Sequence, residues 1–127
     1  MDKDEFIEFT RKRLLLFSFN CISFLSKTYL KHEHIVLKLQ LSKCSTAIGA
    51  NFIEAQATSY KEFTHKMRIA LREANESKYW LTIIHNLNLG DANVRSELLK
   101  EINEIRNLLG SIVSNCNQNI KKNAQKT

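Results

Sequence analysis

Proline is absent from this 127-residue sequence, and glycine occurs only three times. An average protein contains about 5% proline and 7% glycine, and both residues concentrate in turns and at strand edges. So few of them predict few turns and long helices. The composition therefore argues against β-sandwiches, β-barrels and nucleotide-binding folds with glycine-rich loops. The length is that of one domain.

Apolar residues recur at spacings of three and four along four segments of the chain. We predict helices over residues 4–29, 34–57, 59–87 and 92–120, followed by a polar tail at 121–127 that frays. Residues 88–91 read as a tight turn, with Gly90 as a left-handed cap. Four amphipathic helices joined by short links predict an all-α, up-down-up-down four-helix bundle in a single domain, 1–127.

Four polar residues are predicted to have structural roles, namely Asn51, Glu54, Ser59 and Glu62. Ser59 and Glu62 have the spacing of a capping box, in which the Ser hydroxyl accepts from the amide of Glu62 and the Glu carboxylate accepts from the amide of Ser59. Asn51 interrupts the apolar seam of the second helix. If buried, it needs hydrogen-bond partners, for which Ser45 and Glu54 are candidates.

The apolar surface is wider than one bundle core can cover. Residues 14–25 are apolar almost all round the first helix, and the third helix carries a second patch near its end. Because exposed apolar surface of this kind favours association, we predict a homo-oligomer. The predicted interface residues are Leu15, Phe19, Ile22, Trp80, Ile83 and Leu87.

The cysteines at positions 21, 44 and 116 are far apart and form no metal-binding or disulfide pattern, so we expect small core residues in a reducing cytoplasm.

A basic cluster before residues 14–25 resembles a signal peptide. However, Ser18, Asn20 and Ser23 interrupt the apolar stretch, and no cleavage site follows. The stretch is also shorter than the ~20 residues of a membrane span. We predict a cytoplasmic protein with no membrane partner.

Basic residues exceed acidic ones by 19 to 13, giving a formal charge of +6. This charge permits a polyanionic partner, although it also suits simple solubility. The cations fall into three groups at helical spacing, which could contact phosphates but lack the interleaved aromatic residues needed to read bases. A solvated face is the alternative interpretation. The groups are Lys61, His65, Arg68 and Arg72; Lys31, His34 and Lys38; and Arg11, Lys12 and Arg13.

No catalytic motif is evident. His32 and His34 could chelate a metal weakly but lack further ligands, and a solvated turn is the simpler interpretation. A di-iron bundle needs a Glu-x-x-His motif on each of two helices, and this sequence has one, formed by Glu62 and His65. We predict no enzyme activity, no metal and no cofactor.

The second and third helices resemble a known family. The first matching stretch reads Gln40-Leu41-Ser42-Lys43-Cys44-Ser45-Thr46-Ala47-Ile48-Gly49-Ala50-Asn51, and Glu54-Ala55 and Tyr79-Trp80-Leu81 follow it. The pattern resembles the four-helix-bundle proteins encoded in intervening sequences of bacterial 23S ribosomal RNA genes. That family often has a proline near the first link, which residues 30–33 lack here.

The resemblance implies a left-handed bundle that assembles as a cyclic homopentamer, in a family with no established biochemical activity. The accessory proteins of diversity-generating retroelements are similar in fold, and they form basic rings that work with a reverse transcriptase and nucleic acid. We therefore expect an adaptor that contacts RNA or DNA phosphates. The alternative is a scaffold that binds a protein partner without nucleic acid. Salt-dependent retention on nucleic acid separates the two.

Overall fold

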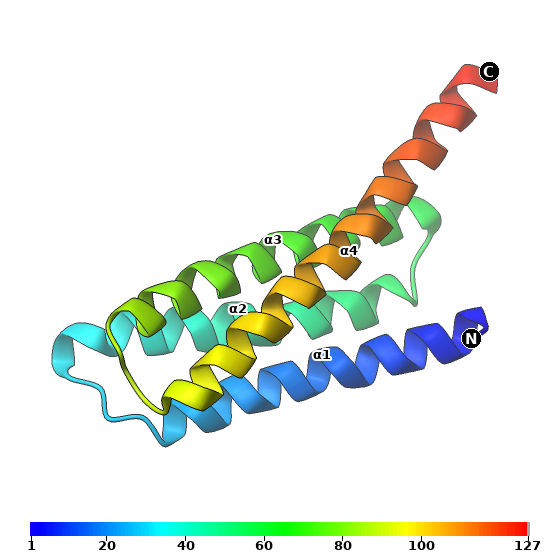
Figure 1. The fold of residues 1–127 in the computed structure, drawn as a ribbon. Coiled ribbons are helices and arrows are strands. Elements are labelled where there is room, and N and C mark those ends of the chain that lie inside the picture. The colour runs from blue at the N-terminus through cyan, green and yellow to red at the C-terminus, as the bar shows by residue number, and fades with distance from the viewer. Residues whose placement is uncertain (127) are drawn as a thin grey trace.

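The computed structural model describes residues 1–126 and is helical throughout, with no strand in that range. The helices are α1 (Lys3–Ser26), α2 (Ile35–Ala55), α3 (Tyr60–Asn86) and α4 (Ala92–Lys126), and a short 3-10 helix, η1 (His32–His34), precedes α2. Successive helices run antiparallel along one bundle (Figure 1). The predicted all-α, four-helix architecture is confirmed, while the handedness and the ring assembly stay predictions.

Three helix ends differ from the sequence prediction by several residues. Helix α1 ends at Ser26 rather than 29, where the Thr28 hydroxyl donates to the carbonyl of Phe24 at 2.6 Å and closes the last turn. Helix α2 ends at Ala55 rather than 57. Helix α4 continues to Lys126 instead of ending at 120, because its polar last turns contain no proline or glycine to stop them. Thr127 lies outside the described residues.

The core forms where the four apolar seams meet along the bundle axis. Each helix contributes fully buried side chains, and burying one large apolar side chain contributes roughly 1.5–3 kcal/mol. They include Leu14, Phe17, Leu41, Ile48, Met67, Leu81, Ile102 and Leu109. A Cβ placed on Gly49 would lie 3.4 Å from the Cβ of Leu14, at van der Waals distance, so α1 and α2 pack closely at this point.

Polar side chains cap the helix starts. The Ser59 hydroxyl accepts from the amide of Glu62 at 3.4 Å, which confirms Ser59 as the N-cap of α3. Within residues 1–126 the Glu62 carboxylate makes no return bond to Ser59, so only half of the predicted capping box forms. The Glu62 charge instead lies near Lys66, whose pKa is raised mainly by its hydrogen bond to Glu54, with Glu62 adding to the increase.

Asn51 is half-buried and hydrogen-bonded, as predicted, but its predicted partners are wrong. Its side-chain amide donates to the carbonyl of Ala47 one turn earlier at 2.8 Å. That local bond needs no other helix. The Glu54 carboxylate instead pairs with the Lys66 ammonium of α3 at 2.8 Å. The backbone carbonyl of Ser45 accepts a hydrogen bond from the Ser18 hydroxyl.

Gly90 and Arg95 fix the link between α3 and α4. Gly90 has a φ of 73°, and a Cβ there would lie 2.5 Å from the Thr28 hydroxyl. The predicted left-handed glycine is therefore confirmed, and it also seats the link against α1. Arg95, for which no role was predicted, is buried and donates to the carbonyls of Leu89 and Gly90 at 2.8 and 2.7 Å.

Candidate nucleic-acid interface

A basic stripe runs along the outer face of α3. Lys61, His65, Arg68 and Arg72 are separated by four, three and four residues, so they lie above one another on the helix, and all four are exposed. The opposite face of α3 carries the buried Met67 and other core residues. The amphipathic pattern that buries one face of α3 therefore presents these cations to solvent on the other.

Two arginines cross the seam between α3 and α4. Arg68 donates to the side-chain oxygen of Asn117, and Arg106 donates from Nε to the side-chain oxygen of Asn75 at 2.6 Å. A carboxamide orients a guanidinium through a hydrogen bond but does not neutralise its charge. Positive charge is therefore held in place along this seam rather than cancelled.

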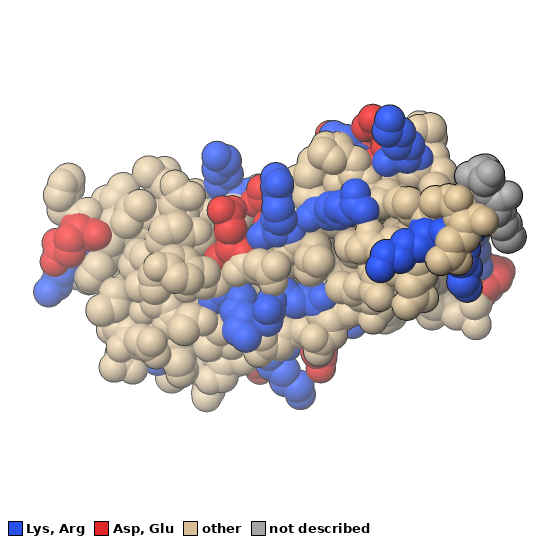
Figure 2. Space-filling model, turned by 90° about the horizontal axis from the view of Figure 1, so that it is seen from above, with Lys and Arg blue, Asp and Glu red and all other residues tan. Residues whose placement is uncertain are grey.

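Arg106 was not predicted as a site residue, although the sequence contains a signal for it. Asn103, Arg106, Gly110 and Asn117 fall at helical spacing on α4, and they were overlooked beside the stronger apolar repeat. Several Lys and Arg side chains lie across the middle of the molecule seen from above, with Asp and Glu side chains beside some of them (Figure 2). The α3 stripe, Arg106 and their asparagine partners together form what we call the α3/α4 face.

The cations of α1 have a different environment. Arg11 and Lys12 both pair with Glu8, at 2.5 and 3.8 Å. Arg13 reaches across to α4, where Glu101 and Glu104 each accept from its guanidinium at 2.6 Å. The hydrogen bond from Arg11 lowers the pKa of the Glu8 carboxyl, and the bond to Glu101 raises the pKa of Arg13. Three carboxylates thus balance the three cations that the sequence grouped as a phosphate site.

Lys31 and Lys38 are not part of the α3/α4 face. Lys31 lies in the link between α1 and α2, at the opposite end of the bundle from the start of α3 (Figure 1). Its amide donates to the ring nitrogen Nδ1 of His34 at 3.3 Å. Lys38 is exposed on α2. The structure therefore gathers only Lys61, Arg68 and Arg72 from the predicted phosphate-binding residues.

The predicted interface residues divide into two groups. Leu15, Phe19, Ile22 and Leu87 are exposed, with Phe19 presenting 67% of its surface. Trp80 and Ile83 instead pack partly against the core, so the second patch on α3 is smaller than the sequence suggested. Other exposed apolar side chains were not among the predicted interface residues. They include Phe9 and Leu16 on α1 and Ile35, Val36 and Leu39 on α2.

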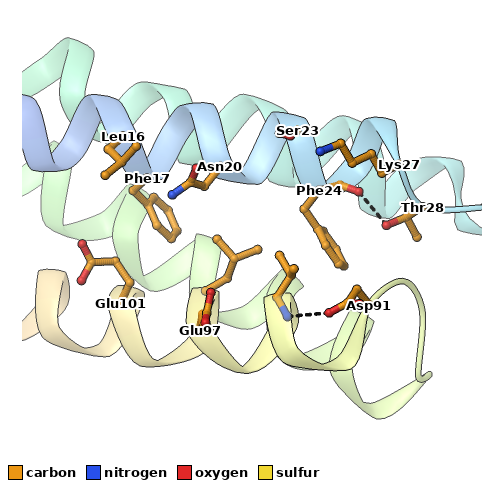
Figure 3. Close-up of a pocket in the computed structure, with 12 residues that line it drawn as sticks. Leu16, Phe17, Asn20, Ser23, Phe24, Lys27, Thr28, Asp91, Glu97 and Glu101 are labelled. Atoms are coloured by element: carbon orange, nitrogen blue, oxygen red, sulfur yellow. Dashed lines mark hydrogen bonds between the residues drawn. The ribbon is translucent and has the colours of Figure 1, made fainter.

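A cleft of about 440 Å³ lies between α1 and α4. Phe17 and Phe24 point into it from α1 (Figure 3). The opposite side carries Asp91, just before α4, and Glu97 and Glu101 on α4. Glu101 is paired with Arg13, and the charges of Asp91 and Glu97 would repel phosphates. The cleft therefore does not extend the α3/α4 face as a nucleic-acid surface.

The three cysteines are buried in the bundle. Cys21, Cys44 and Cys116 are free and buried, as predicted for core residues. Burial raises the pKa of the Cys21 thiol to about 12 and also raises that of Cys44.

Within residues 1–126, no three His, Cys, Asp or Glu side chains gather where they could hold a metal ion. No helix in that range combines the length and apolarity needed to cross a membrane.

Comparisons with known proteins point to one family. A family model described as "23S rRNA-intervening sequence protein" matches residues 12–111. A crystal structure of a protein of unknown function from the S23 ribosomal protein family of Bacteroides thetaiotaomicron is 28% identical in sequence, with a TM-score of 0.74. The alignment covers 82% of this chain and 97% of that chain. No curated protein sequence matches.

Proposed function

The chain belongs to the 23S rRNA-intervening sequence protein family, and from that premise we propose that it is a non-enzymatic adaptor that contacts RNA or DNA phosphates. The contacts are made by the α3/α4 face. One observation carries the proposal: Arg68 and Arg106 are held by asparagine side chains, whereas the α1 cations are paired with carboxylates. Unneutralised, oriented guanidiniums suit phosphate oxygens, which accept their hydrogen bonds in pairs.

The chain also self-associates, on this proposal, through the exposed apolar face of α1. Leu15 and Phe19 expose more than half of their surface, and covering them in a second copy removes that area from water. The ring of five follows from the family resemblance. Several copies of a weak phosphate-binding face on one assembly would bind a long polyanion much more tightly than one copy does.

A protein-binding scaffold is the second candidate function. The same α1 face supports it, since an exposed apolar surface suits a different protein chain as well as an identical one. In that case the α3/α4 face is a solvated surface and binds no nucleic acid.

Two double variants, each of which removes two positive charges, test the proposal. Arg68→Gln with Arg72→Gln removes two cations from the α3/α4 face, while Arg11→Gln with Lys12→Gln removes two that already pair with Glu8. We expect the first pair alone to lower the dependence of log affinity on log salt, by about one for each lost phosphate contact. Fluorescence anisotropy with RNA and DNA duplexes measures it. Absence of binding by the wild type at low salt would favour the scaffold.

A further inference from the structure

An exposed aromatic residue continues the basic stripe of α3. Tyr79 follows Arg72 by seven residues, which is two helical turns and about 10.5 Å along the axis. Between them, Asn75 holds the Arg106 guanidinium over the seam. Along this face, Arg68 and Arg72 are followed by Arg106, which is bound to Asn75, and then by the ring of Tyr79.

The Tyr79 ring is both accessible and supported. It exposes 62% of its surface and meets the Trp80 ring edge to face, with centroids 5.1 Å apart and planes at 80°. Because the rings are nearly perpendicular, Trp80 can cover at most one face of Tyr79. Trp80 itself packs against the core, so it gives the tyrosine a fixed neighbour.

We infer that the α3/α4 face binds an unpaired nucleic-acid segment, with phosphates on Arg68, Arg72 and Arg106 and one base stacked on Tyr79. This inference rests on the proposed function and specifies its ligand as single-stranded. Bases in a duplex already stack on each other, whereas an unpaired base offers its face to an aromatic side chain. The positive charge of the stripe complements a polyanion and disfavours a basic protein partner.

The other exposed tyrosine on α3 differs in its surroundings. Tyr60 stacks nearly parallel on Phe63, with centroids 6.3 Å apart, and its hydroxyl accepts from the side-chain amide of Asn119. One face of its ring is therefore occupied by the protein itself. Tyr79 is the more exposed of the two, at 62% against 49%, and it continues the stripe beyond Arg72.

The test compares single strands with a duplex. Fluorescein-labelled oligouridylate, oligodeoxythymidylate and a duplex of about 20 units exceed the site size of most single-strand binding folds. We expect Tyr79→Ala to weaken single-strand binding roughly 5- to 140-fold, as loss of one stacked base does, and to leave the salt dependence unchanged. Tyr79→Phe should retain affinity, while Tyr79→Leu, which keeps apolar bulk, should not. The RNA and DNA strands show which sugar is preferred.

Tyr29→Ala is the matched control, because Tyr29 is 82% exposed and lies outside the helices. Circular dichroism checks that each variant remains helical. Equal binding of duplex and single strand by the wild type, with no effect of Tyr79→Ala, would overturn the inference but leave the proposed function standing. A change in oligomer mass on Tyr79→Ala without loss of single-strand affinity would also overturn it. Failure of every nucleic acid to bind at low salt would overturn both.

Discussion

The outer faces of α1 and α3 have opposite chemistry, although both helices carry clustered cations. On α1, Glu8, Glu101 and Glu104 pair with the cations, and large apolar side chains such as Leu15, Leu16 and Phe19 are exposed beside them. On α3, the outer face is polar, and asparagines hold the arginines at the seam with α4. Helix α4 borders both faces and supplies acids toward α1 and amides toward α3.

This difference shows that a cluster of basic residues in a sequence does not define a phosphate site. The partner of each cation decides how much charge remains available to a ligand. A face with balanced charges and exposed apolar side chains suits contact with protein. A face with unbalanced, oriented cations suits a polyanion. We therefore propose self-association through the α1 face and nucleic-acid contact through the α3/α4 face.

The largest expected effect concerns the α1 face. Leu15→Glu with Phe19→Glu places two charges in the proposed subunit interface, and burying unpaired charges is strongly unfavourable. We expect the assembly to dissociate to monomers while the helical content is retained, because both side chains are exposed in the single chain. Light scattering measures the change, from about five times 14.7 kDa to 14.7 kDa.

Thr46→Glu with Thr82→Glu provides a control, because both threonines are exposed on other helices. Those substitutions should leave the mass unchanged. A wild-type protein that remains monomeric on concentration would contradict the assignment of the α1 face. It would leave the exposed leucines and phenylalanines without a partner.

The second prediction concerns a variant in which the arginines of the α3/α4 face are paired with carboxylates, as the cations of α1 are. Asn75→Asp with Asn117→Asp keeps the shape of both side chains but gives Arg106 and Arg68 carboxylate partners. Exposed ion pairs contribute about 0.2–1 kcal/mol each, so the free energy of unfolding should rise slightly. The salt dependence of RNA binding should fall by about one for each neutralised arginine. Urea denaturation and anisotropy titrations measure the two effects.

A control of equal charge distinguishes local pairing from net charge. Asn88→Asp with Asn93→Asp adds two carboxylates at exposed positions in the link between α3 and α4 and at the start of α4, away from both faces. If the control weakens binding as much as the first pair does, the partner of each arginine does not matter. The comparison between the faces would then have no functional meaning.

The fold could be predicted from sequence because it depends on periodic burial. The seams place Leu14, Leu41, Met67 and Ile102 on the core sides of four helices, and all four are fully buried. The helix ends were less accurate, since a local bond such as that of Thr28 decides where a turn stops. Arg95 was missed because its partners are carbonyls of a link whose path the sequence does not reveal.

The site could be predicted only in part. The spacing of Lys61, Arg68 and Arg72 on one helix was sufficient to place them on one face. The pairing of Arg13 with Glu101 joins residues that are 88 positions apart, so only the packing of α1 on α4 reveals it. Contacts between helices therefore determine which cations are available, and helical spacing alone cannot report them.

The smallest expected effect concerns Glu73, the carboxylate beside Arg72 on α3. Burial raises the pKa of Glu73, the neighbouring Glu76 adds to the increase, and Lys43 and Arg72 oppose it. The folded state thus binds a proton more readily than the unfolded state, and the free energy of unfolding falls as the pH rises above 4.5 through the folded-state pKa. Glu73→Gln removes this loss.

We expect Glu73→Gln to stabilise the protein at pH 7 by roughly 0.2–0.5 kcal/mol, a small value because solvent screens the group, and to have no such effect at pH 3.5. Urea denaturation at the two pH values measures it. The substitution also leaves Arg72 with one acidic neighbour fewer, so the salt dependence of RNA binding should rise slightly. Glu62→Gln is the opposite control, because Glu62 lies in the first turn of α3, where a negative charge favours the helix. Equal stabilisation at both pH values would mean that the charge of Glu73 is not the cause.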